Sequence, residues 1–157
     1  MRYFLDTEFM ESGPLSPITL LSIGIVAEDG REFYAINQDA DWSVANDWVA
    51  ENVLPSLRQG KGSDVFTYDS IAARIVDFVG ESTPEFWGYY ADYDWVVFAQ
   101  LFGAMINLPK GWPMYCRDIK QLCDELGNPS LPAQELTEHD ALNDARWNKL
   151  AFEFLRK

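Results

Sequence analysis

The chain has 157 residues, 48% of them hydrophobic, and a formal net charge of −13 at pH 7. This length suffices for one well-buried core but not for two comfortable domains, so residues 1–157 are expected to form a single domain. The acidic balance argues against a long basic groove for nucleic acid, and no apolar run approaches the roughly 20 residues that span a bilayer.

The first part of the chain predicts three strands joined by hairpins. The strands are expected at residues 3–9, 18–27 and 31–36, with a tight turn at Asp29-Gly30 between the last two. The chain starts with a charged strand rather than with an apolar leader and a small-residue cleavage site, so a cytoplasmic location is expected.

Helices and strands alternate along the rest of the chain. Helices are predicted at residues 44–57, 70–79, 95–105, ahead of Gly127 and at 141–155, strands at 85–90 and 115–116, and a polar loop at 129–137. Pro55 is expected to end or bend the first of these helices. Hairpin-connected strands followed by strand–helix alternation predict an α/β fold, a mixed sheet flanked by helices.

Two carboxylates interrupt the apolar first strand. Asp6 and Glu8 are separated by one residue, so on a strand both side chains point to the same face, about 7 Å apart. Burial of a carboxylate there without a cation would be costly, whereas carboxylate oxygens are the ligands that Mg²⁺ prefers. The spacing therefore favours a metal site over a solvated polar face.

Further acidic groups and the only histidine of the chain follow at two later points. Asp94 comes after the strand at residues 85–90 and opens a helix, and Asp92, two residues earlier, is its rival. His139 lies on a polar loop just before the last helix, and Asp144 lies one turn inside that helix. A carboxylate at a helix start is often only a cap, but this set suits hard-metal chemistry.

Together these residues resemble the DEDDh branch of the 3′-to-5′ exonucleases, which have a ribonuclease H-like fold. The first family motif matches Asp6-Thr7-Glu8, and the third matches His139 and Asp144. The second fits Gly88 to Asp94 with Asp94 as the acid, although Tyr89 and Tyr90 stand where the family commonly has Asn and His.

The resemblance is most specific at the two ends of the chain and runs along its full length. The matching segments are Met1–Phe9, Ser22–Glu32, Val53–Pro55 and His139–Leu142. They are similar to the small actinobacterial 3′-exoribonucleases that are described as polyadenylate-specific. Each motif is short, so the specificity comes from their order, their spacing and their placement on strands and helices.

The resemblance implies two divalent metal ions, Mg²⁺ or Mn²⁺, and a catalytic residue set. Asp6, Glu8 and Asp144 would hold one ion, and Asp6 with Asp94 the other. His139 would act as general base, a role that neutral imidazole suits near pH 7. The implied activity releases nucleoside 5′-monophosphates from the 3′ end of single-stranded RNA or of a 3′ overhang.

Aromatic residues make up 15% of the chain, which leaves some rings for stacking on bases. The candidates for substrate contact are Phe9, Met10, Trp42, Tyr89 and Tyr90. The expected partner is a single-stranded nucleic acid 3′ end, with RNA favoured over DNA and no membrane. A homodimer is compatible with the resemblance.

Two alternatives remain open at the level of sequence. A DNA exonuclease of the proofreading type would use the same site, because the contact to the 2′-hydroxyl that selects RNA can come from backbone groups near Glu8 and Phe9. A catalytically inactive nuclease-like module that binds RNA or a protein is the other alternative. The complete set of five polar residues argues against it.

Overall fold

The computed structural model describes residues 1–58, 64–134 and 139–157. Within these residues, six strands form one sheet in the order β4-β3-β2-β1-β5-β6. They are β1 (Arg2–Met10), β2 (Thr19–Ala27), β3 (Glu32–Asn37), β4 (Val65–Phe66), β5 (Glu85–Gly88) and β6 (Arg117–Asp118). β1, β2 and β3 pair antiparallel, whereas β4 pairs parallel to β3, β5 to β1 and β6 to β5. The predicted mixed α/β sheet is confirmed.

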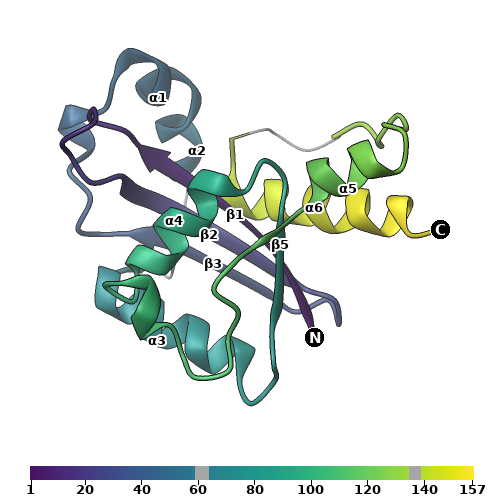
Figure 1. Cartoon of the computed structure of the whole chain (residues 1–157). Helices are drawn as coiled ribbons and strands as arrows, with labels where there is room; N and C mark the ends of the chain where they lie inside the picture. Colours follow the sequence, from purple (N-terminus) through teal and green to yellow (C-terminus); the bar gives the residue numbers. More distant parts are fainter. Residues whose placement is uncertain (59–63, 135–138) are drawn as a thin grey trace.

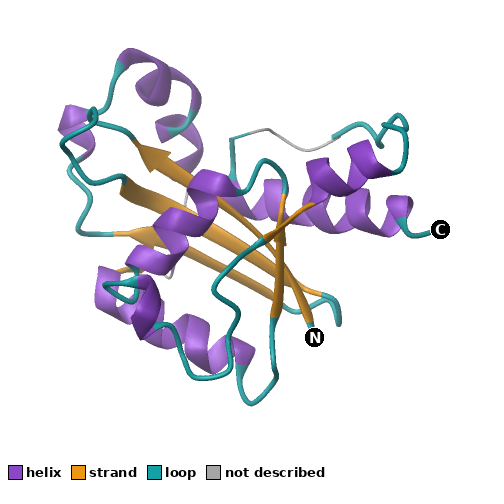
Figure 2. Ribbon diagram, in the orientation of Figure 1, coloured by secondary structure: helices purple, strands orange, loops and turns teal. Residues whose placement is uncertain are grey.

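Helices cover both faces of this sheet (Figures 1 and 2). They are α1 (Asp47–Asn52), α2 (Leu54–Arg58), α3 (Tyr68–Val79), α4 (Asp92–Gln100), α5 (Ile119–Glu125) and α6 (Ala141–Leu155), with short 3-10 turns at Trp42–Val44 and Met105–Asn107. α3 and α4 lie on one face, and α6 with α5 lies on the other. In the described part of the chain, no helix is long and apolar enough to cross a bilayer.

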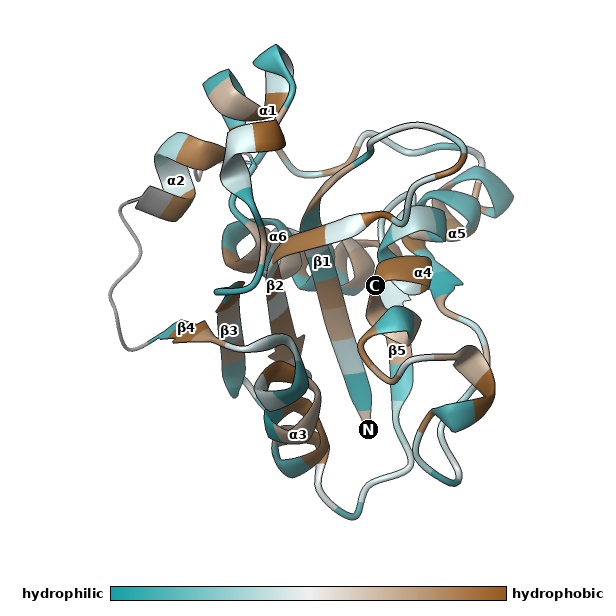
Figure 3. Ribbon diagram, turned by 90° about the vertical axis from the view of Figure 1, so that its left-hand side faces the viewer, coloured by the Kyte–Doolittle hydropathy of each residue, from teal (hydrophilic) through white to brown (hydrophobic). Residues whose placement is uncertain are grey.

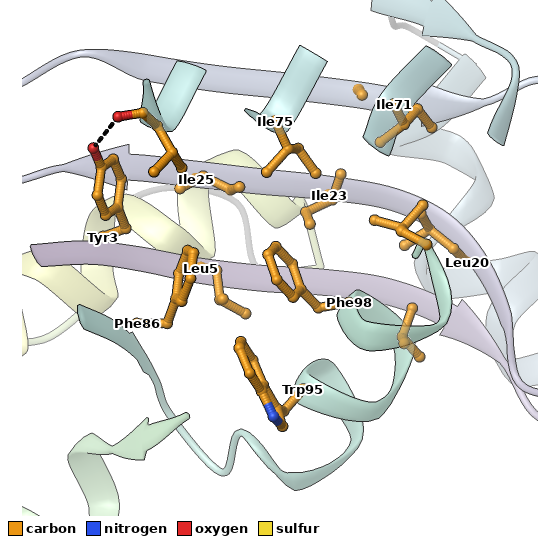
Figure 4. Packing of buried hydrophobic residues seen from close by; sticks show 14 of the residues in the cluster. Tyr3, Leu5, Leu20, Ile23, Ile25, Ile71, Ile75, Phe86, Trp95 and Phe98 are labelled. Carbon is orange, nitrogen blue, oxygen red and sulfur yellow. Dashed lines mark hydrogen bonds between the residues drawn. The ribbon is translucent and has the colours of Figure 1, made fainter. Parts of the chain in front are cut away.

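The alternation of side chains along β1 decides what each face of the sheet contains. Tyr3 and Leu5 point into the larger core, where they meet α3 and α4 through residues such as Ile75 and Phe98 (Figure 4). Phe4 points the other way, into the cluster under α5 and α6. With a period of two residues, Asp6 and Glu8 belong to the face of Phe4, which α6 covers.

The predicted helix at residues 44–57 is two helices instead of one. Asn46 caps α1 by accepting a hydrogen bond from the backbone N–H of Val49 at 2.9 Å, and α1 ends at Asn52, with Val53 as the cap residue that separates it from α2. Pro55 was expected to end or bend the helix, yet it lies in the first turn of α2, where its missing N–H has no intrahelical partner to lose. In Figure 3, β1 runs from the N-terminus toward the end of the sheet where these two helices lie.

Several predicted boundaries also shift around β5 and α4. β5 ends at Gly88 rather than at residue 90, because Tyr90 has a left-handed φ of +55°, which no strand allows. α4 begins at Asp92, three residues before the predicted start, and ends at Gln100. The short strand expected at residues 115–116 is found at Arg117–Asp118, and β4 was not predicted. Part of the predicted loop at 129–137 lies outside the described residues.

Candidate active site

Three acidic side chains from the two ends of the chain converge on one point. Asp6 and Glu8 come from β1 and Asp144 comes from the first turn of α6, and one oxygen of each lies within 4.8 Å of the others. Glu8 is 7% exposed, while Asp6 and Asp144 are half-buried. This spacing suits a divalent cation held between carboxylate oxygens.

A glycine in β2 allows α6 to lie close enough for this convergence. Gly24 pairs with Asp6 across the β1–β2 ladder. A Cβ atom at Gly24 would lie 2.2 Å from the carbonyl oxygen of Ala141, the first residue of α6. Any side chain at this position would therefore push the start of α6, and Asp144 with it, away from β1.

A buried side-chain amide sets the position of α6 relative to β1. The Nδ2 atom of Asn148 donates a hydrogen bond of 2.9 Å to the backbone carbonyl of Leu5, and the side chain is 1% exposed. Asn148 lies one helical turn after Asp144, so both side chains face β1. Neither Gly24 nor Asn148 was predicted as a site residue, because each acts through a contact between distant segments.

Further hydrogen bonds orient the carboxylate of Asp144. The backbone N–H of Asp140 donates to its Oδ2 atom at 3.2 Å, and the side-chain amide of Gln134 donates to its Oδ1 atom. The side chain of Asp140 caps α6 by accepting from the backbone N–H of Asn143 at 3.0 Å. The acidic side chain at Asp140 is therefore a helix cap, and no sequence motif predicted the contact of Gln134 with Asp144.

Asp94 approaches the cluster from the other side of β1. It is 7% exposed, and its Oδ1 atom accepts hydrogen bonds from the backbone N–H of Thr7 at 2.8 Å and from the Thr7 hydroxyl at 2.7 Å. Thr7 stands between Asp6 and Glu8, so these bonds attach Asp94 to the centre of the acidic motif. Its rival Asp92 is exposed. The geometry thus favours Asp94 as the fourth acid of the site.

The loop that leads into α4, the helix that carries Asp94, is held in place by an acid from β6. The carboxylate of Asp118 accepts a hydrogen bond of 2.8 Å from the backbone N–H of Ala91. A Cβ atom at Gly88 would lie 2.7 Å from the Ala91 side chain, so glycine permits the tight approach of this loop to the sheet. The start of α4 is therefore fixed relative to β1.

Burial and the crowding of acids raise the pKa values of these carboxylates. Burial is the largest cause at each position. It raises the pKa of Glu8 to about 8, with the negative charges of Asp144 and Asp94 as the next causes, and it raises the pKa of Asp94 to about 6 against the hydrogen bonds from Thr7. The pKa of Asp6 is also well above its ordinary range, because Asp94, Asp144 and Glu8 add repulsion to burial.

These shifts indicate that the ionised cluster lacks compensating positive charge. Burial also raises the pKa of Asp144, although the amide of Gln134 and the nearby His139 oppose this. A divalent cation between the three carboxylates would favour their charged forms and relieve the repulsion. The all-oxygen donor set fits a hard cation such as Mg²⁺ or Mn²⁺.

His139 lies beside the cluster in an unusual backbone conformation. Its φ angle is +60°, in the left-handed region, one residue before the cap of α6. The imidazole meets the indole ring of Trp48 in α1 edge to face, with ring centroids 4.9 Å apart and planes at 79°. The histidine is thus placed between the start of α6 and the helix at the end of the sheet.

The comparison with protein families places the chain in a known group. A family model described as the 3′-5′ exoribonuclease Rv2179c-like domain matches residues 1–155. The chain belongs to this family. Two relatives from Mycobacterium tuberculosis, the 3′-5′ exoribonuclease MT2234.1 of strain CDC 1551 / Oshkosh and the 3′-5′ exoribonuclease Rv2179c of strain ATCC 25618 / H37Rv, are each 40% identical over 149 residues. The match covers 93% of this chain and 88% of each relative.

Solved structures show the same fold in more distant proteins. The zinc-bound complex of Escherichia coli ExoI with single-stranded DNA has a TM-score of 0.70 at 14% identity, over 98% of this chain. Cell-death related nuclease 4 has a TM-score of 0.52 at 12% identity, over 99% of this chain. The Rv2179c-like chain spans only 39% and 62% of these two proteins. Their likeness confirms the predicted ribonuclease H-like fold.

In this Rv2179c-like domain the candidate substrate residues occupy different environments. Tyr90 is 64% exposed, and its ring meets that of Tyr89 edge to face at 4.7 Å. Phe9 stacks on Tyr93, with centroids 5.7 Å apart and planes at 8°. The other two candidates, Met10 and Trp42, are packed in or against the hydrophobic cluster under α1 and α2. Tyr90 therefore offers the most free ring surface of the candidate set.

Proposed function

We propose that this protein is a metal-dependent 3′-to-5′ exoribonuclease that releases nucleoside 5′-monophosphates. The observation that carries the proposal is the convergence of Asp6, Glu8 and Asp144 within 4.8 Å. Membership of the Rv2179c-like family supports it, since the Mycobacterium tuberculosis relatives are named 3′-5′ exoribonucleases. The proposed substrate is single-stranded RNA, or a 3′ overhang, in the cytoplasm.

The acidic cluster is the proposed holder of two divalent ions, Mg²⁺ or Mn²⁺. Asp6, Glu8 and Asp144 would hold one, and Asp6 with Asp94 the other. Ions bound there supply positive charge that stabilises the reacting phosphate and the departing 3′ oxygen. The hydrogen bonds from Thr7 to Asp94 and from Gln134 and Asp140 to Asp144 keep these carboxylates oriented before any ion arrives.

His139 is the proposed general base. A neutral imidazole nitrogen accepts the proton of the water that attacks the terminal phosphodiester. The position of His139 near Asp144, at the edge of the acidic cluster, favours this role. The released 3′-terminal nucleotide then carries a 5′-phosphate, and the shortened RNA carries a new 3′-hydroxyl.

Aromatic side chains near the acids are proposed to hold the terminal bases. The exposed Tyr90 lies just before α4, which carries Asp94, and Phe9 stacks on Tyr93, the neighbour of Asp94 in that helix. Trp42 completes the proposed aromatic set from the side of α1, whereas Met10, also predicted to contact substrate, is buried in the cluster under α1 and α2. A base stacked on an aromatic ring contributes about 1–3 kcal/mol, and because every base has such a face this binding is tolerant of sequence.

The test is a degradation assay with RNA labelled at its 5′ end. Wild-type protein with Mg²⁺ or Mn²⁺ should shorten the strand one nucleotide at a time. EDTA or Asp6→Ala should abolish the reaction, and His139→Ala should slow it by roughly 10²–10⁴-fold, the usual contribution of a general base. Internal cuts, or activity that persists in chelator, would overturn the proposal.

Matched oligonucleotides separate the alternatives in the same assay. Faster removal from DNA than from RNA of the same sequence would indicate an exonuclease of the proofreading type. Tight binding of either strand without any shortening would indicate an inactive binding module. Homopolymers of each base would show whether adenines are preferred, and light scattering of the same preparation would show whether the protein is a homodimer.

A further inference from the structure

The rings of Trp48 and His139 are in contact although the two residues are far apart in the sequence. Trp48 lies in α1 beyond the end of the sheet, and His139 lies just before α6. Their ring centroids are 4.9 Å apart and their planes meet at 79°, the edge-to-face arrangement that aromatic pairs prefer. We infer that Trp48 is a positioning residue that holds the imidazole of His139 in its working orientation. The inference rests on the proposed function, in which His139 is the base.

His139 needs such a contact because its backbone is strained. A residue with a side chain rarely adopts the left-handed region, so a φ of +60° there persists only where surrounding contacts hold it. The start of α6 is fixed by Ala141 against Gly24 and by the Asp140 cap, but these contacts do not reach the imidazole. Among residues 1–58, 64–134 and 139–157, the contact that reaches the imidazole ring is the one with Trp48.

Trp48 is suited to this role because its own backbone is anchored. Asn46 caps α1, and the carbonyl of Trp48 accepts a hydrogen bond of 2.8 Å from the Nδ2 atom of Asn52. Val49 and Val53, on the inner side, are buried in the cluster that joins α1 and α2 to the sheet. Trp48 itself is 54% exposed, so its indole is not part of the core and is free to contact the imidazole from the surface of α1.

The chemical consequence concerns the rate of proton transfer rather than the binding of substrate. A general base must lie within hydrogen-bond reach of the proton that it takes, and a displacement near 1 Å can cost about 10²-fold in rate. Removal of the indole frees the imidazole to rotate toward solvent. The turnover number should then fall while the Michaelis constant for RNA changes little.

The test compares Trp48→Ala, Trp48→Leu and Trp48→Phe in the full chain. Alanine and leucine lack the aromatic ring and should lower kcat by about 10-fold to 100-fold, whereas phenylalanine should stay within about threefold of wild type. KM should remain within about threefold in all three. Phe154→Ala removes an exposed ring at the far end of α6 and serves as the matched control, with no change in either constant.

A second readout follows the imidazole directly, without turnover. His139 is the only histidine of the chain, so its ring protons give one identifiable set of NMR signals in untagged protein. These signals should move in Trp48→Ala and Trp48→Leu through loss of the ring current, should move less in Trp48→Phe, and should stay in place in Phe154→Ala. If Trp48→Ala does not fold, the pair of leucine and phenylalanine variants decides.

Failure of the inference and failure of the proposed function give different results. Wild-type protein without exonuclease activity would refute the proposed function, whereas active wild type with full kcat in Trp48→Leu would refute only the positioning role. A raised KM with unchanged kcat would also overturn it, because Trp48 would then bind RNA instead. Unmoved imidazole signals in Trp48→Leu would show that the rings do not meet in solution.

Discussion

The crowded carboxylates should make the metal-free protein less stable at high pH, and Glu8→Gln should remove part of this effect. The folded-state pKa of Glu8 is about 8 against an ordinary value of 4.5. Because the folded state holds this proton more tightly, the stability contribution is present below the ordinary pKa and is lost as the pH rises through about 8. Glutamine has nearly the same volume but no charge, so it does not undergo this loss.

The size of the effect follows from the pKa shift. With the folded pKa at about 8, Glu8 lowers the free energy of unfolding relative to a side chain that stays neutral at every pH. The difference is about 4 kcal/mol at pH 8 but only about 1 kcal/mol at pH 5. In EDTA at pH 8, Glu8→Gln should therefore be about 2–4 kcal/mol more stable than wild type, the lower value allowing for relaxation of the site. For a chain of this size, that corresponds to a rise in Tm of roughly 5–15 °C.

The assay is thermal and urea unfolding of both proteins in EDTA at pH 5 and pH 8, and again with Mg²⁺. Glu125→Gln, which removes an exposed carboxylate of α5, is the control and should change little at either pH. Wild type should gain stability from Mg²⁺, whereas Glu8→Gln should gain less and should lose exonuclease activity. If Glu8→Gln were no more stable than wild type in EDTA at pH 8, the argument from burial and repulsion of the Glu8 carboxylate would be wrong.

Three further predictions concern the contacts that build the site. Gly24→Ala forces a Cβ atom against Ala141, so it should cost about 3 kcal/mol or more in urea unfolding and should lower activity by displacing Asp144. Asn148→Ala leaves the buried carbonyl of Leu5 unpaired, and a loss of about 1–3 kcal/mol is expected in the same measurement. Asp94→Asn retains an oxygen that can accept both Thr7 hydrogen bonds, so its Tm should stay near that of wild type while activity with Mg²⁺ falls; an active Asp94→Asn would remove this residue from the proposed metal set.

The local patterns of the sequence were sufficient for the fold class and for most elements. Alternation and turn residues predicted the three hairpin-connected strands, and the apolar stripe from Ala141 to Leu155 gave the last helix with the bounds that are observed. The errors fall where tertiary contacts override local pattern. The helix at residues 44–57 splits at Val53, and the strand at 85–90 stops before Tyr90, which turns into the left-handed region.

The acidic motif shows how far sequence alone reaches in this protein. The spacing of Asp6 and Glu8 by itself placed two carboxylates on one face of a strand, because side chains alternate along every strand. That Asp144 meets them, and that Asp94 reaches Thr7 from the opposite side, was decided only by the tertiary structure. The reason is that a bare Cα at Gly24 and one amide at Asn148 set the position of α6, and such contacts between distant segments leave no periodic trace in the chain.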